Sequence, residues 1–194
     1  MIRRKNLIAK AYLNLIDAEN LEKAAKNSRD KLLIHLLHRL GCRITEELGI
    51  STDNIDFNSG KITIVHLKSR VYLNCRNCGN KLGLKHDFCP QCGAKSDLTS
   101  LERSERRRQR QLPLDTASLD MIKTYIEQGG PILRNGKMYL FNINRHRAWQ
   151  IVRECAEKAG LGDLINPETG KVRGVSPHRI RDAFAIHAMK VDDS

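Results

Sequence analysis

The chain has 194 residues, with 34 lysines and arginines against 22 aspartates and glutamates, a formal net charge of +12 and a pI of about 9.7. The composition, with 40% apolar and 29% charged residues, is typical of a folded, soluble protein and excludes a disordered one. No apolar run approaches the ~18 residues of a membrane span and no signal peptide is evident, so we expect a cytoplasmic protein.

The charge favours a nucleic acid partner over a basic surface that serves only solubility. Aromatic residues are few, with one Trp, four Tyr and four Phe, which disfavours single-strand binding by base stacking. A duplex held through its phosphates is therefore the better expectation.

The first 48 residues predict a short lead-in followed by helices, because apolar residues recur there at helical spacing. We expect a basic lead-in over 1–12, helices over Asp17–Asn27 and Ser28–Gly41, and a short helical piece over Cys42–Leu48. Arg43 directly follows the Leu-rich helix. An arginine at this position is not expected to stabilise the core, which favours a functional role. A salt bridge to Glu46 or Glu47 is the plain alternative.

Two strands are predicted next, over Ile55–Phe57 and Lys61–Val65, joined by a turn at Asn58-Ser59-Gly60. The second strand is expected to end at His66–Arg70. Gln111–Leu114 is predicted to be the next strand of the same sheet. Residues 71–101 between them are therefore expected to be an insertion.

The insertion contains two Cys-x-x-Cys pairs separated by ten residues, and a glycine follows each pair. This is the doubled knuckle of a zinc ribbon, because each pair closes a tight turn whose thiolates can face one ion. A cytoplasmic chain disfavours disulfides, and a redox pair would need only one such motif. The predicted ligands of a structural zinc are Cys75, Cys78, Cys89 and Cys92.

The other candidate ligands have simpler interpretations. His86 is expected on the surface, since four thiolates already complete a tetrahedron. Cys42 and Cys155 lie in helical apolar patterns and are expected to be core thiols.

Residues 103–110 hold five arginines in eight positions. A solvated, flexible arm is one interpretation. An arm that follows DNA phosphates is the other, because basic strands flank the run.

The C-terminal half predicts a helix over Asp115–Glu127, a short apolar segment at 138–141, a helix over Asn144–Lys158 and a loop over Leu161–Gly174. The stretch Ser176–His187 then starts a further helix, with Pro177 suited to its first position.

His178 and Arg181 are three residues apart and so share one face of the first turn of this helix. An imidazole and a guanidinium presented at a helix N-terminus can bind a phosphate.

Taken together, these stretches resemble the catalytic domain of the tyrosine recombinases, the phage integrase or Xer-like family. The resemblance runs from about residue 14 to the last residue, and archaeal members with a Cys-x-x-Cys ribbon in this hairpin look closest. It is carried by Leu40–Leu48, similar to the family's Gly-x-Arg-x-x-Glu-Leu box, by Gly60–Lys68, by Arg110–Leu114 and by Ser176–His187, similar to its His-x-Leu-Arg-His-x-Phe-Ala-x-His box.

The resemblance implies an α+β, mostly α fold: a helical core over 13–194 with a small antiparallel sheet, interrupted by the zinc ribbon at 71–101. It also implies that Arg43 and Arg181 clamp the scissile phosphate, that Lys68 protonates the leaving 5′-oxygen and that His178 assists proton transfer. The zinc would be structural, with no cofactor for catalysis.

The partners implied are double-stranded DNA and, on that DNA, other recombinase subunits, with no membrane and no small-molecule substrate. The predicted DNA contacts are Arg43, Lys68, Arg70, Arg106, Arg107, Arg108, Arg110 and Arg181.

The sequence departs from the family in one respect that bears on activity. The family's second His or Trp and its nucleophilic Tyr follow the His-x-x-Arg helix, and the chain stops at Ser194 before either position. None of Tyr12, Tyr72, Tyr125 and Tyr139 matches the nucleophile, and His187 matches the helix's own core His. The family's DNA-encircling N-terminal domain is also absent, so we expect no DNA cleavage by this chain alone.

Three interpretations follow. The first is an integrase catalytic domain that lacks its C-terminal end, and the second is a non-enzymatic DNA-binding remnant or regulator. The third is a zinc-ribbon interaction module on a helical scaffold, in which the arginines and histidines need not converge.

Overall fold

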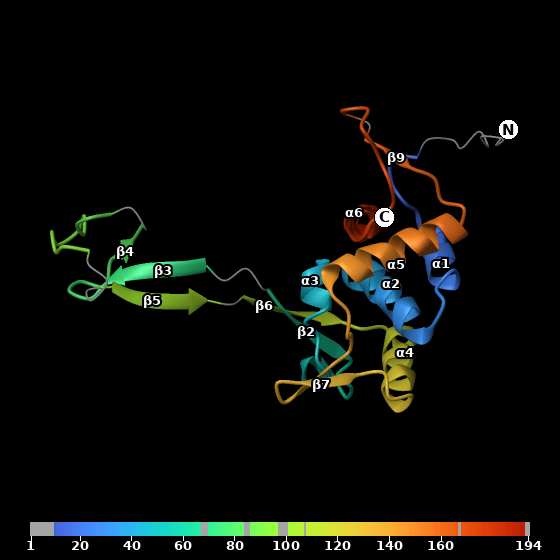
Figure 1. Ribbon diagram of the computed structural model, residues 1–194, viewed down its shortest axis with the longest axis horizontal. Coiled ribbons are helices and arrows are strands. Elements are labelled where there is room, and N and C mark those ends of the chain that lie inside the picture. The colour runs from blue at the N-terminus through green and yellow to red at the C-terminus, as the bar shows by residue number, and fades with distance from the viewer. Residues whose placement is uncertain are drawn as a thin grey trace. The chain divides into compact units, whose positions relative to one another are not determined.

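The computed structural model describes residues 10–66, 70–83, 86–96, 101–106, 108–166 and 168–192. The chain forms two compact units, Met1–Ile64 with Arg110–Ser194, and Val65–Gln109 (Figure 1). The predicted insertion at 71–101 lies within the second unit. Each unit is described by itself below.

The first unit is organised around one buried helix, α2, which contacts five others. Figure 1 shows α5 crossing α2, with α1 near one end of α5 and α3 near the other. The helices of this unit are α1 (Leu15–Lys23), α2 (Ser28–Leu40), α3 (Ile44–Glu47), α4 (Thr116–Glu127), α5 (Arg145–Lys158) and α6 (Pro177–Asp192), with a 3-10 turn, η1, at Thr52–Asn54.

The sequence of α2 explains both its limits and its burial. The side chain of Asn27 accepts a hydrogen bond from the backbone N–H of Asp30 at 2.9 Å and so caps the N-terminus. Gly41 ends the helix in a left-handed conformation with φ 53°. Apolar residues lie on nearly every side of α2, which suits a helix that is covered all round; those fully buried are Leu32, Leu33, Ile34, Leu36 and Leu37.

Short antiparallel strands complete the first unit. One sheet has the order β1 (Ile55–Asp56), β2 (Lys61–Val65), β6 (Gln109–Pro113), with Ile55 opposite Ile62. Two small hairpins join β7 (Ile132–Arg134) to β8 (Lys137–Tyr139), and β9 (Leu164–Ile165) to β10 (Val172–Arg173).

The second unit is a three-stranded sheet with the order β4–β3–β5, formed by β4 (Lys81–Leu82), β3 (Arg70–Cys75) and β5 (Leu101–Arg106). Leu73 of β3 pairs with Leu82 of β4. Its small apolar centre consists of Cys75, Leu82 and Cys89, with Leu73 and Ala94 packed against them.

The predicted fold class is confirmed in its main feature, an α-rich chain with small antiparallel sheets. Two predicted boundaries are wrong. The first helix covers Leu15–Lys23 instead of Asp17–Asn27, because Asn14 and Asp17 cap each other's backbone N–H at 2.9 Å. The loop predicted over 161–174 contains β9 and β10, and the backbone N–H of Ile165 also donates to the carbonyl of Lys10.

The predicted strand Gln111–Leu114 is β6, in which Pro113 is the last residue. The apolar segment at 138–141 begins in β8 and continues into Leu140 and Phe141, both buried in the main core. Within the described ranges, no helix is both long and apolar enough to cross a membrane.

Candidate nucleic-acid interface and metal centre

Arg43 lies at the junction of α2 and α3, where it is the N-cap residue of the short helix α3. Glu46 reaches back from the first turn of α3: its Oε2 accepts from the Arg43 backbone N–H at 3.0 Å and its Oε1 accepts from Arg43 Nη1 at 3.1 Å. The salt bridge weighed in the sequence analysis is thus present, to Glu46. The Arg43 side chain nevertheless stays 44% exposed, while that of Glu46 is only 1% exposed.

Arg110, on β6, supplies a second guanidinium to the same carboxylate, with Nη2 3.2 Å from Glu46 Oε2 and a side chain 40% exposed. Burial works against the ionisation of Glu46, but hydrogen bonds from Arg43 and the charge of Arg110 outweigh it. The pKa of Glu46 is therefore below its ordinary value. The result is an ionised, buried carboxylate that holds two half-exposed cations.

Glu47, the next residue, has no such partners. It is fully buried, its Oε1 has no hydrogen-bond partner among the described residues, and the Cys42 thiol lies 3.8 Å from its Oε2. Burial raises the pKa of Glu47 well above the ordinary value, and it raises the pKa of Cys42 too. Burial therefore favours the neutral form of the Glu47 carboxyl group.

The helix α6 carries the second predicted phosphate-binding pair. The carbonyl of Ser176 accepts from the backbone N–H groups of Arg179 and Ile180, which starts the helix just before Pro177. His178 is 73% exposed, and its Nε2 lies 3.9 Å from Oδ1 of Asp182.

Arg181 is half-buried, and its side chain makes no hydrogen bond or ion pair with another described residue. Asp182, which stands where the family pattern has a second His, pairs instead with Arg179 at 3.0 Å. Among the described residues, none occupies the guanidinium donors of Arg181.

The two halves of the predicted site come from elements that pack together. Helices α2 and α6 are in contact, and the Phe184 ring lies so close to Gly41 that a Cβ atom added there would overlap it. Gly41 precedes Arg43 by two residues, and Phe184 follows Arg181 by three. The packing therefore brings the segments that carry the two arginines to one region of the first unit.

The remaining predicted DNA contacts fall in the second unit. Arg108 is exposed, and its carbonyl accepts from the backbone N–H of His66 at 2.8 Å. Arg70 and Arg106 face each other across β3 and β5 in the strand register. Lys68 and Arg107 lie outside the described residues, as do the side chains of Arg70 and Arg106.

The second unit also holds the four predicted zinc ligands. The Sγ atoms of Cys75, Cys78, Cys89 and Cys92 all lie within 4.8 Å of one another, and all four are free thiols. Cys75 and Cys92 are 3.6 Å apart and Cys78 and Cys89 are 3.5 Å apart, measured between sulfurs. A Zn–S bond of about 2.3 Å requires a tetrahedral S···S separation of about 3.8 Å, so the four sulfurs fit this metal.

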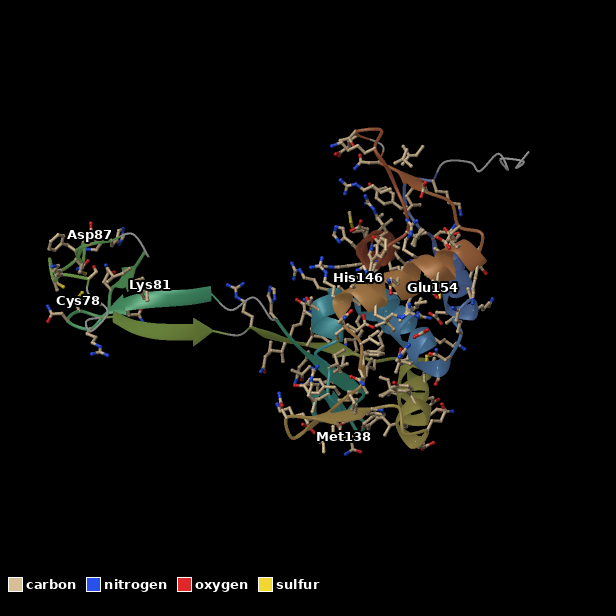
Figure 2. The ribbon with its side chains drawn as sticks, in the orientation of Figure 1. Cys78, Lys81, Asp87, Met138, His146 and Glu154 are labelled. Carbon is tan, nitrogen blue, oxygen red and sulfur yellow. The ribbon has the colours of Figure 1, made fainter. Side chains whose placement is uncertain are left out.

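Matching turns build the two halves of this cluster. Gly79 donates to the carbonyl of Cys75 at 2.7 Å and Gly93 to that of Cys89 at 2.9 Å, and both glycines have φ near 70°. His86, predicted to be a surface residue, is exposed and accepts from the backbone N–H of Gly83. Figure 2 labels Cys78 in this unit.

One exposed cluster on α5 escaped the sequence analysis. Trp149 is 43% exposed, His146 stacks on it with ring centroids 6.3 Å apart, and the Arg153 guanidinium lies 5.5 Å from its centroid. Figure 2 labels His146 near the start of α5. The signal was present, because Trp149 is out of phase with Ala148, Ile151, Val152 and Cys155, which are buried.

A buried polar network was also missed. His35 lies between Glu22 and Ser118, with Nδ1 3.1 Å from Glu22 Oε1 and Nε2 2.8 Å from Ser118 Oγ. It connects α1, α2 and α4. Since His35 and Ser118 are almost fully buried, this network ties helices together and offers no surface to a ligand.

Sequence comparison finds relatives among the tyrosine recombinases. The tyrosine recombinase XerD of Neisseria meningitidis serogroup B is 26% identical over 170 residues, which cover 84% of this chain and 42% of the relative. XerD of Mycobacterium tuberculosis is 23% identical over 198 residues, covering 96% and 48%. The chain spans less than half the length of these two relatives. No protein-family model matches it.

Structure comparison also finds recombinases and an integrase. XerA recombinase superposes with a TM-score of 0.58 at 17% identity, covering 98% of this chain and 54% of that one. The XerH recombinase bound to its difH substrate gives 0.55 at 15% identity, covering 100% and 48%. The Tn1549 transposon integrase in complex with transposon right end DNA gives 0.58 at 15%, covering 97% and 56%.

At these identities the structural likeness establishes the fold, which matches that of the tyrosine recombinases. The neighbours named above in both sequence and structure are tyrosine recombinases and related integrases.

Proposed function

We propose that this chain is part of a tyrosine-type site-specific recombinase or integrase, the part that binds duplex DNA and clamps the scissile phosphate. The observation that carries the proposal is the packing of Phe184 on Gly41, which joins the segments of Arg43 and Arg181. Relatives named tyrosine recombinases and neighbours solved on DNA support it.

The residues of the site suit phosphoryl transfer, which depends mainly on positioning and on neutralising charge. Arg43 and Arg181 would hold the non-bridging oxygens of the phosphodiester, each with donors left open by its present contacts. Lys68 would protonate the departing 5′-oxygen, and the exposed His178 would assist proton transfer.

The predicted DNA-contacting set extends beyond the clamp and would follow the backbone of a double strand. It comprises Arg43, Lys68, Arg70, Arg106, Arg107, Arg108, Arg110 and Arg181. On DNA, other recombinase subunits would be the protein partners, and the Xer-like type with an inserted ribbon would be archaeal.

The four cysteines would bind zinc as a closed structural site. Zinc supplies four bonds that fix the two turns of the second unit, and all four positions of the tetrahedron would be taken by Cys75, Cys78, Cys89 and Cys92. Catalysis would need no metal.

The covalent step of this reaction class needs a tyrosine that forms a 3′-phosphotyrosyl link. None of the four tyrosines in these 194 residues matches that position; Tyr125, for one, is buried and donates its hydroxyl to the carbonyl of Gly130. We therefore propose that these residues bind and position the phosphate without cleaving DNA by themselves.

The test is the affinity for short duplexes of several unrelated sequences, measured by fluorescence anisotropy. Arg181→Ala should lower the affinity roughly tenfold on every duplex alike, as for a lost phosphate contact. Arg181 has no partner among the described residues, so its removal leaves no buried charge unpaired. Lys123→Ala on α4 removes an exposed cation and is the matched control. Equal effects of the two variants would reject the clamp.

A further inference from the structure

The arrangement around Glu46 has an uneven charge balance. Among the contacts of the described residues, this buried carboxylate accepts from the Arg43 backbone N–H at 3.0 Å, from Arg43 Nη1 at 3.1 Å and from Arg110 Nη2 at 3.2 Å. Two guanidinium groups thus face one carboxylate. Taken by themselves, these three side chains carry a net charge of +1.

The position of that charge depends on Arg110. If Glu46 paired with Arg43 alone, the pair would be neutral, and Arg43 would attract an anion weakly. Because Arg110 also compensates Glu46, Arg43 keeps most of its charge for a ligand. Both arginine side chains remain more than a third exposed.

The fold holds Glu46 and Arg110 in place. Glu46 is held by the capping of α3, while Arg110 arrives on β6 from 64 residues further along the chain. A buried carboxylate that lost the Arg110 cation would draw more strongly on Arg43.

We propose that Arg110 is a positioning residue for Arg43 that acts through Glu46. By compensating the Glu46 carboxylate it leaves the Arg43 guanidinium charged and oriented for a DNA phosphodiester. This inference rests on the proposed function and adds to it the means by which Arg43 is kept available.

The test is a double-mutant cycle on duplex affinity, at a temperature where circular dichroism shows every variant folded. Arg110→Ala should weaken binding roughly tenfold, the low end of a charge-assisted hydrogen bond. Glu46→Gln keeps one acceptor oxygen, enough for the Arg43 backbone N–H, and removes the negative charge. Arg110→Ala combined with Glu46→Gln should therefore restore the affinity to within about threefold of wild type.

Two results would overturn the inference. If Glu46→Gln fails to rescue Arg110→Ala, then the effect of Arg110 on affinity comes from its own DNA contact and not through Glu46. If Arg110→Ala lowers the melting temperature but leaves the affinity of the folded protein unchanged, its role is structural only. Arg110→Lys, which keeps the charge without the planar fork, should retain most of the affinity.

The cycle also separates this inference from the proposed function. If wild type binds duplex and Arg181→Ala weakens it, the proposed function stands whatever the cycle shows. If wild type does not bind duplex, the proposed function fails first.

Discussion

The aromatic ring of Phe184 lies directly against the backbone of Gly41, in space that any larger residue at position 41 would occupy. This contact joins the end of α2 to the middle of α6. Since Arg43 and Arg181 lie two and three residues from its two members, it is the packing relationship on which the proposed phosphate clamp depends.

We predict that Gly41→Ala destabilises the chain by roughly 2–4 kcal/mol. The alanine would have to keep a left-handed φ, and its methyl group would also have to displace the Phe184 ring. Gly129→Ala is the control: its φ is 73°, but nothing lies within 4 Å of an added Cβ. It should cost only about 1–2 kcal/mol. Chemical denaturation measures both, and equal losses would mean that the contact with Phe184 does not matter.

We predict that Glu47 makes stability depend on pH. Burial raises the pKa of Glu47 in the folded chain above its value of 4.5 in the unfolded chain. The free energy of unfolding is therefore unaffected by this group below pH 4.5, and it decreases as the pH rises from 4.5 toward the pKa of the folded chain. Glu47→Gln should therefore gain stability over wild type by up to about 1.4 kcal/mol per pH unit above that point.

The measurement is denaturant unfolding of both proteins across the pH range. Glu157→Gln, at an exposed position on α5, should give a curve parallel to wild type. A stability difference between Glu47→Gln and wild type that stays constant with pH would contradict the buried neutral acid.

We predict that Cys75→Ser lowers bound zinc from one equivalent toward none and loosens the second unit, while the first unit stays folded, because each unit has its own apolar core. Metal analysis and hydrogen exchange over the two units would show this. Cys155→Ala removes a buried thiol from the first unit and should leave the zinc content unchanged. Unfolding of the whole chain by Cys75→Ser would show that the units are not independent.

We predict that duplex DNA changes the emission of Trp149, the single tryptophan. It is 43% exposed beside His146 and Arg153, so a phosphate backbone drawn to the Arg153 guanidinium would change the solvent around the indole. A titration of wild type followed by fluorescence tests this. No change at saturating DNA would place the duplex away from α5.

Much of the fold could be predicted because its signals are local. Asn27 and Gly41 mark the ends of α2, and Asp115 and Asn144 cap α4 and α5 as their sequences indicate. The β7–β8 hairpin was missed although Asn135-Gly136 is a strong turn signal, with φ of 49° and 74°.

The site was predictable to the same extent. The cysteine cluster follows from spacing, and the Arg43–Glu46 pair follows from a separation of three residues along a helix. Arg110 was predicted to contact DNA, but its bond to Glu46 was not predictable, because it joins residues 64 apart. Only the folded chain brings such groups together.

The most direct test of the account is the salt dependence of duplex binding, for wild type and for Arg43→Ala combined with Arg181→Ala. Wild-type affinity should fall steeply as salt rises, with a log–log slope of about −0.9 for each phosphate contacted. The double variant should bind more weakly and have a slope shallower by about one unit, as for one lost phosphate contact. A flat wild-type response, or a slope that the two substitutions leave unchanged, would contradict the phosphate clamp.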